Sequence, residues 1–500
     1  MSGRLVEGPS AELIRSAYRL ELAAAPSLLP ELTLADLAHV LTLLDGGHVP
    51  ADAGRRLVVA LLELGASGAT GGGGPGARGA GLDPAQGDLV MNREARLRER
   101  IGGDAGYLLV GRPRREAATV AFHLAARRRL LSLAGALERL QTVLVTLAAR
   151  HMRTLAVDYT YWQAAQPTTL AHALLGYAYP LRRDAARLHA AFGRVDLSPA
   201  GAGCTSGATL PLDRAALAES LGFAGVVPHA RDANWQADLA VELSAIAASV
   251  GLALDRLAED LQIWGTREFG FVELADRASR VSLAMPQKKN PYALVFVRGV
   301  AGRLIGRLAG AAAVARTASG QPDPRIFAQD EVPAALELAE QAAALLAEVV
   351  DGLRFDRERL AAAARRGYLA ANDLAELIMM RRGIPFGTAH RIVGEAVRLA
   401  LAAGREEDGI DAAALDMAAR EVAGVPLGLD DAAVREALDP GAAVARRTGI
   451  GGAAPAAVRT LLTEQRRSLR RQRSWTAARA AALAAAEMRL LERARAAAAG

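Results

Sequence analysis

The segment Ser282-Leu-Ala-Met-Pro-Gln-Lys-Lys-Asn-Pro291 concentrates more reactive side chains than any other stretch of this chain. It also contains the only two lysines, Lys288 and Lys289, among 60 Lys and Arg residues. Because arginine serves almost everywhere else, these two positions indicate a need for an ammonium group, a compact and strongly hydrated charge that a planar guanidinium does not imitate. Two surface lysines retained by chance are the alternative. We therefore expect the chemistry of the protein in this segment.

Long helical patterns lie on both sides of this segment. Apolar residues recur at steps of three and four within 124–149, 234–264 and 291–318. The longest stripe spans about 39 Å of helix at about 1.5 Å per residue. It consists of Leu239, Leu243, Ile246, Val250, Leu254, Leu257, Leu261 and Trp264. Uninterrupted helices of this length predict an elongated bundle.

Turn signals divide the chain into four parts. We predict an N-terminal helical domain over 1–108, a central long-helix domain over 109–355 that carries a loop at 279–292, and a small C-terminal helical domain over 356–465. An Arg-rich helical tail over 466–500 follows, and its arginines predict a solvated basic face, with a site for an anionic partner as the alternative. The Gly-rich stretch 65–87 buries too little apolar area to offset its ordering entropy, which predicts a mobile loop.

Composition predicts a mainly helical fold and restricts the function classes. The chain of 500 residues is 51% hydrophobic but only 4% aromatic, and much of the apolar content is alanine, which favours closely packed helices. No apolar run reaches the roughly 18 residues of a membrane span, so no membrane contact is expected. The single cysteine, Cys204, rules out an internal disulfide and suits the cytoplasm. The net charge of +6 comes without a nucleic-acid motif, so nucleic-acid binding is not expected.

The pattern Ser-x-x-Met-Pro-x-Lys-x-Asn at 282–290 resembles the signature loop of the fumarase/aspartase superfamily, in the form that is typical of argininosuccinate lyases. Four further segments resemble that family in the same order and spacing, and the resemblance extends over roughly residues 30–465. These segments are Thr160-Tyr-Trp-Gln-Ala-Ala-Gln-Pro167, Glu268-Phe-Gly-Phe-Val-Glu273, Arg298-Gly-Val-Ala-Gly-Arg303 and Asn372-Asp-Leu374.

The resemblance implies an all-α chain of three domains whose long helices form the twenty-helix core of a homotetramer, with active sites shared between subunits. It also implies β-elimination from a small carboxylate substrate, with release of fumarate and without a metal or other cofactor. Ser282 matches the residue that accepts the proton, whereas Lys288 and Asn290 match residues that bind carboxylate and stabilise the anionic intermediate. Thr160, Gln163, Gln287 and Arg112 match substrate-binding positions. Lys289 is expected to point into solvent.

Two catalytic positions depart from the family pattern. The family's histidine falls on Tyr161, and its glutamate partner falls on Val295. The reference pKa of tyrosine lies about 3.5 units above that of histidine, which corresponds to about 4.8 kcal/mol in proton affinity. We therefore expect Tyr161 to be a neutral proton donor, with an aromatic plug of the vacated space as the alternative.

Substrate-binding positions depart as well. In Leu109-Val-Gly-Arg-Pro-Arg-Arg-Glu116, proline and Arg115 replace the family's serine and asparagine, and Arg115 is a candidate for binding a relocated carboxylate. The family's Tyr, Gln and Lys near 321–333 are missing, and Arg325 and Gln329 are the nearest candidates. His39 and His390 are expected to be structural.

These departures leave three hypotheses. The first is a divergent lyase that acts on an amino-dicarboxylate-like substrate other than argininosuccinate. The second is an inactive homologue with a structural or regulatory role. The third is a bond-forming enzyme of specialised metabolism that uses the same pocket.

Overall fold

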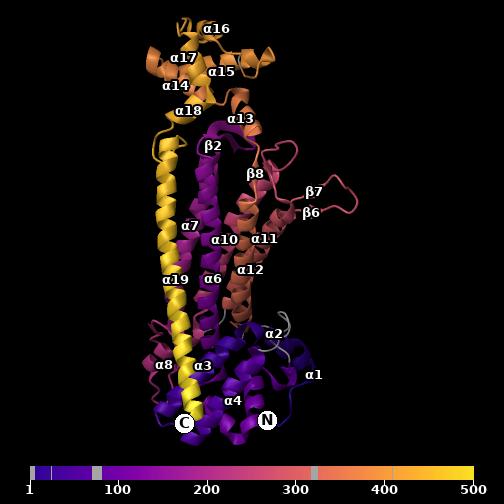
Figure 1. Ribbon diagram of the computed structural model, residues 1–500, viewed down its shortest axis with the longest axis vertical. Coiled ribbons are helices and arrows are strands. Elements are labelled where there is room, and N and C mark those ends of the chain that lie inside the picture. Colours follow the sequence, from indigo (N-terminus) through magenta and orange to yellow (C-terminus); the bar gives the residue numbers. More distant parts are fainter. Residues whose placement is uncertain (1–5, 24, 70–80, 317–324, 408) are drawn as a thin grey trace.

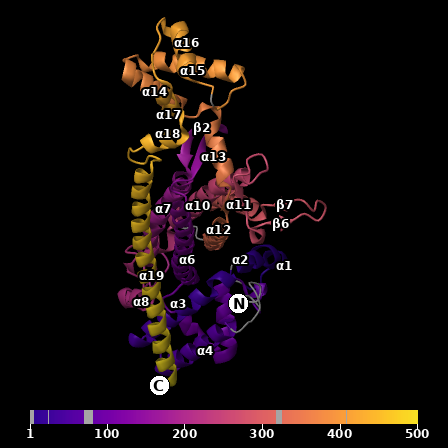
Figure 2. The same ribbon diagram turned by 45° about the horizontal axis from the view of Figure 1, so that its top comes forward.

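A computed structural model describes residues 6–23, 25–69, 81–316, 325–407 and 409–500 and has an elongated, mainly helical shape (Figure 1). The N-terminal helices form one end, a small helical domain forms the other, and long helices connect the two (Figures 1 and 2). The buried apolar residues form separate large clusters in these three regions. The prediction of a mainly helical chain is confirmed.

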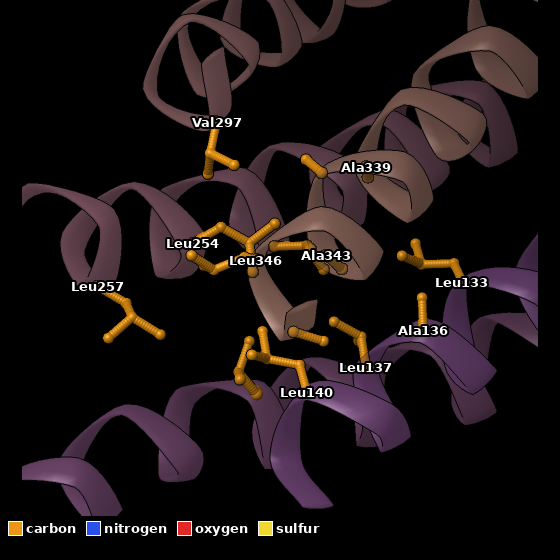
Figure 3. Close-up of a cluster of buried hydrophobic side chains, with 14 of the residues drawn as sticks. Leu133, Ala136, Leu137, Leu140, Leu254, Leu257, Val297, Ala339, Ala343 and Leu346 are labelled. Carbon is orange, nitrogen blue, oxygen red and sulfur yellow. The ribbon is translucent and has the colours of Figure 1, made fainter. Parts of the chain in front are cut away.

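Within the described residues, the central bundle consists of five helices. They are α6 (Arg114–Arg150), α7 (Leu170–Val195), α10 (Ala237–Trp264), α11 (Tyr292–Ala315) and α12 (Arg325–Asp351). Of these, the apolar stripes predict α6, α10 and α11. Every residue of the stripe from Leu239 to Trp264 is buried. Alanines such as Ala136 and Ala339 lie among leucines of facing helices, which lets the backbones approach closely (Figure 3).

Further helices, most of them short, form the N-terminal end and cover the lower part of the bundle. In chain order they are α1 (Ala11–Leu13), η1 (Ile14–Tyr18), α2 (Arg19–Ala23), α3 (Ala25–Asp45), α4 (Ala51–Ala69), η2 (Pro84–Gln86), α5 (Leu89–Ile101), η3 (Gly102–Leu109), α8 (Arg214–Ser220) and α9 (Ala230–Trp235). The loop expected at 65–87 begins later than expected, because α4 continues to Ala69; residues 70–80 lie outside the described residues.

Helices separated by Gly and Pro follow the central bundle and form its C-terminal end. They are α13 (Arg357–Arg365), η5 (Arg366–Tyr368), α14 (Ala371–Arg382), α15 (Phe386–Ala402), α16 (Ala412–Ala423), α17 (Asp431–Leu438) and α18 (Pro440–Arg446). Gly383 ends α14 in the left-handed conformation at φ 66°, which costs glycine nothing.

The last helix, α19 (Pro455–Ala499), is continuous and shows no break at the expected domain boundary of 466. Leu462 and Leu469 join the core of the central bundle, whereas Leu490 and Ala494 join the N-terminal core. The expected tail is therefore a structural helix that runs along the length of the bundle (Figure 1).

All strands are short and occur in pairs. They are β1 (Leu155–Thr160) with β2 (Gln163–Thr169), β3 (Leu197–Ser198) with β4 (Gly225–Val226), β5 (Val272–Glu273) with β8 (Arg354–Phe355), and β6 (Arg280–Val281) with β7 (Lys289–Asn290); η4 (Asp276–Ala278) precedes β6. The hairpin β1–β2 lies where the bundle meets the C-terminal domain, and the hairpin β6–β7 projects from the side of the bundle (Figure 1).

Three helices are long and apolar enough to cross a membrane, judged by length and composition alone: Ser27–Asp45, Arg114–Arg150 and Ala237–Trp264. This finding corrects the expectation that no segment reaches such a length. Between 56% and 67% of the residues in their most apolar windows are buried inside the chain. These helices thus use much of their apolar surface in packing within the chain.

Candidate active site

The signature segment is a projecting hairpin. Strands β6 and β7 pair antiparallel, with Arg280 opposite Asn290 and Val281 opposite Lys289. Residues 283–288 of the connecting loop are all exposed, and Leu283 is as exposed as in a free chain. An apolar side chain held in solvent at the tip of a hairpin is typical of a surface that is covered in another state or by another chain.

Ser282 lies at the start of this loop and is only partly exposed. Its Oγ accepts a hydrogen bond from the backbone N–H of Met285 at 3.1 Å. A second turn follows, in which the N–H of Lys288 donates to the carbonyl of Met285 at 3.0 Å. An amide donor aimed at a hydroxyl oxygen stabilises negative charge on that oxygen, which is what a proton-accepting serine requires.

The two lysines have different environments. Lys288 is exposed, and none of the ion pairs among the described residues includes it. Lys289, by contrast, does not point freely into solvent as expected: its Nζ lies 3.0 Å from Oε1 of Glu273 and 2.7 Å from Oδ1 of Asp276. The hydrogen bond between Lys289 and Asp276 is the main cause of a raised pKa of Lys289 and a lowered pKa of Asp276.

Tyr161 lies at the tip of the hairpin β1–β2. Thr160 pairs with Gln163, so that Tyr161 and Trp162 alone form the turn. Both have positive φ, 53° and 58°, a conformation that two-residue hairpin turns require and that Asn and Gly adopt most easily. Tyr161 is 98% exposed and therefore fills no space within its own chain. Thr160 and Gln163 are exposed beside it.

In the segment at 112–116, Arg112 and Glu116 are buried, whereas Arg114 is exposed. Arg112 donates to Oδ1 of Asp36 at 2.5 Å, and Arg93 also binds this carboxylate. Nη2 of Arg112 is buried without a hydrogen-bond partner among the described residues. Arg115 lies 3.3 Å from Oε1 of Glu21. In a single chain both arginines thus serve packing of the N-terminal end, and their substrate-binding roles stay predictions.

Sequence reasoning missed a buried polar group behind this segment. Glu116 accepts hydrogen bonds from the N–H groups of Gly201 and Gly203 at 2.8 and 2.6 Å, and burial raises its pKa. Asn234 donates to the carbonyl of Gly203 at 2.8 Å. Gly201 and Gly203 donate through their backbone and lie more than 80 residues from Glu116 in the sequence. No local motif therefore reveals this group. The group holds the 200–204 loop against α6.

The remaining predicted residues have the following places. Gln287 is exposed near the tip of the β6–β7 hairpin, and Val295 is half exposed on α11. Arg325 and Gln329 belong to the first turns of α12, and their side chains lie outside the described residues. His39 is buried with Nε2 at 3.1 Å from the carbonyl of Val110, a structural contact as expected.

Within the described ranges, no group of three or more His, Cys, Asp or Glu side chains is arranged to hold a metal ion. A cavity of about 430 Å³ lies between the C-terminal domain and β2, and Gln166, Asp373 and Arg446 are part of its lining. The two hairpins and the start of α6 thus lie at separate places in one chain (Figures 1 and 2).

Comparisons with known proteins agree with the resemblance of the motifs. A lyase family model matches residues 77–306, and an argininosuccinate lyase C-terminal model matches residues 368–445. The argininosuccinate lyase of Methanoculleus marisnigri is 37% identical over 92% of this chain and 92% of its own length. That of Mycolicibacterium vanbaalenii is 37% identical over 93% of this chain and 95% of its own. Among solved structures, an EDDS lyase variant with bound fumarate has a TM-score of 0.86 at 27% identity, over 99% of this chain and 97% of that one.

Proposed function

Because the chain belongs to the argininosuccinate lyase family of the fumarase/aspartase superfamily and is a carbon–nitrogen lyase, we propose that it eliminates an amine from an amino-dicarboxylate-like substrate other than argininosuccinate. The product is fumarate or a similar unsaturated acid. One observation carries this proposal: the hairpin with Ser282, Lys288 and Asn290 is retained, while Tyr161 occupies the place of the family's histidine. The proton-abstracting part of the site is therefore kept and the part that serves the leaving group is changed.

Each retained residue has a role in the proposed elimination. Ser282, as an alkoxide stabilised by the N–H of Met285, takes a proton from the carbon next to a carboxylate. The electron pair moves onto that carboxylate, where the ammonium of Lys288 and the amide of Asn290 stabilise the added charge. The electron pair then returns to form the carbon–carbon double bond as the bond between the neighbouring carbon and nitrogen breaks, and the hydroxyl of Tyr161 donates a proton to the leaving amine.

The changed positions support a substrate with different groups around the reacting carbon. Val295 carries no charge where the family has a carboxylate, and Arg115 adds a cation where the family has an asparagine. An EDDS lyase shares this fold at 27% identity over almost the whole chain, so the fold also accommodates a lyase with a substrate other than argininosuccinate.

A substrate panel tests the proposal. We expect the purified protein to release fumarate from at least one N-substituted aspartate, followed by ultraviolet absorbance, and to do so faster than from argininosuccinate. Ser282→Ala should lower kcat by at least about 100-fold, because a positioned proton acceptor contributes about 10²–10⁴. Absence of turnover for the whole panel, with Ser282→Ala equally silent, would support the inactive homologue instead. Product analysis with fumarate and amines as starting materials identifies a bond-forming enzyme.

The proposal includes a homotetramer with shared sites. Tyr161, Lys288 and the loop residues around them are exposed at separate places in one chain, so a partner chain is needed to bring them together. Helix α11 offers a face for close contact, since nothing lies within 4 Å of a Cβ placed at Gly299, Gly302, Gly306 or Gly310. A helix of a second copy can approach such a face closely.

A further inference from the structure

The pairing of Lys289 separates the roles of the two neighbouring lysines. Its ammonium lies between two carboxylates that come from different elements, Glu273 at the end of β5 and Asp276 in η4. Its side chain is 37% exposed, whereas that of Asp276 is 96% exposed. The contact therefore ties strand β7, and with it the projecting hairpin, to a segment that pairs with β8 next to α12 and α13.

The alternation of a β-strand gives this contact a consequence for the site. Successive side chains of a strand point to opposite faces, so Lys289 and Asn290 within β7 point to opposite sides of the hairpin. The ammonium of Lys289 lies on the side of the hairpin that faces Glu273 and Asp276. Asn290, which matches a carboxylate-binding position of the family, is thereby directed to the other side, and Lys288 lies in the loop directly before the strand.

A second contact holds the same end of the hairpin. The guanidinium of Arg280, which pairs with Asn290 across the ladder, lies 5.0 Å from the centre of the Tyr292 ring at the start of α11. Beyond these contacts, residues 283–288 are exposed. The base of the hairpin is thus fixed on both strands, and the tip is free to move.

We propose that Lys289, through Glu273 and Asp276, is a positioning residue that clamps the base of the β6–β7 hairpin and so presents Lys288 and Asn290 to the substrate carboxylate. This inference rests on the proposed function for the identity of the ligand, but the clamp itself does not. It also explains why both lysines persist in a chain that uses arginine elsewhere: Lys288 supplies a free ammonium, and Lys289 supplies one nitrogen that two carboxylates approach.

The rarity of lysine provides a direct measurement of the clamp. A protease that cleaves only after lysine has no target in this chain outside residues 288 and 289. Its cleavage rate on the native protein therefore reports the opening of this hairpin alone. We expect the double variant Glu273→Gln/Asp276→Asn, which keeps both lysines, to be cut about three- to tenfold faster than the parent protein, since exposed ion pairs contribute modestly.

The matched control is Glu395→Gln, which breaks a surface ion pair with Arg398 on α15, far from the hairpin in sequence. Its cleavage rate should equal that of the parent protein. Circular dichroism and gel filtration verify that each variant keeps its fold and assembly. A double variant that is cut no faster than Glu395→Gln overturns the clamp, whether or not a substrate is known.

Kinetics then test the positioning role. We expect Lys289→Gln to raise KM for the dicarboxylate substrate severalfold and Lys289→Arg to restore only part of the affinity, because arginine keeps the charge but not the single nitrogen between Glu273 and Asp276. A loss of folded enzyme alone would lower kcat and leave KM unchanged. An unchanged KM in Lys289→Gln overturns the positioning role. Lack of turnover by the parent protein refutes the proposed function, while the proteolysis result still decides the clamp.

Discussion

At the scale of single residues, the turn formed by Tyr161 and Trp162 is the clearest sign of a functional constraint. Two-residue turns of this kind favour Asn-Gly, and a bulky residue with positive φ costs on the order of 1–3 kcal/mol. Here both residues are aromatic and have positive φ. Tyr159 supports the turn, with its ring centre 6.4 Å from that of Trp162 and 5.6 Å from that of Phe269. The strain is consistent with a side chain held in place for a partner or a substrate.

The hydroxyl of Tyr161 should therefore matter more than its ring. We expect Tyr161→Phe to lower kcat by about 100-fold with little change in KM, because loss of a positioned proton donor costs about 10²–10⁴. The measurement is steady-state release of fumarate. For a substrate whose leaving group needs no proton, the kcat of Tyr161→Phe should be close to that of the parent protein. Full activity of Tyr161→Phe would instead identify Tyr161 as a space-filling residue.

At the scale of elements, α11 has two faces with different tasks. Leu294, Val297 and Leu304 are buried against the rest of the bundle. The other face carries exposed glycines at 299, 302, 306 and 310 together with exposed Phe296 and Ile305. Glycine inside a helix costs about 1 kcal/mol relative to alanine, so four of them on one face require a compensating contact. We assign that contact to another copy of the chain.

A bulky residue on this face should disrupt assembly and leave the chain folded. We expect Gly302→Leu to shift the proposed tetramer to smaller species in light scattering, since nothing in its own chain lies within 4 Å of an added Cβ. The matched control is Gly394→Leu on α15, where an added Cβ also meets nothing within 4 Å. Unaltered assembly of Gly302→Leu at full helicity would contradict the role of this face.

At the scale of the whole molecule, α6 and α19 connect the N-terminal end to the bundle. Residues of both helices contribute to the central and the N-terminal cores. His123 lies on α6 near the junction of the two cores and is fully buried, with Nδ1 at 3.1 Å from the carbonyl of Val195. Burial is the main reason why its pKa falls to about 4. The guanidinium of Arg127 lies nearby, 3.8 Å from the centre of the Phe223 ring.

This histidine links global stability to pH. Its pKa is lower in the folded state than the ordinary value of 6.5, so the unfolded chain binds more protons between the two values. The contribution of neutral His123 to the free energy of unfolding is complete above pH 6.5. It decreases as the pH falls toward 4, by about 3 kcal/mol in total. Urea unfolding of the parent protein and of His123→Gln at several pH values measures this. The variant should show a smaller loss of stability over that range, whereas His390→Gln on the surface should match the parent protein.

The sequence alone determined the helical class, the long stripes of the bundle and the family, because hydrophobic periodicity and the motif at 282–290 are local. It also indicated that Lys288 and Lys289 were special. Only the tertiary structure decided that Lys289 is bound by Glu273 and Asp276, that Arg112 is paired with Asp36, and that α19 is one continuous structural helix. These contacts join positions far apart in the chain or depend on which face of an element is buried. Pairings of this kind leave no periodic trace in the sequence, since their partners are selected by packing.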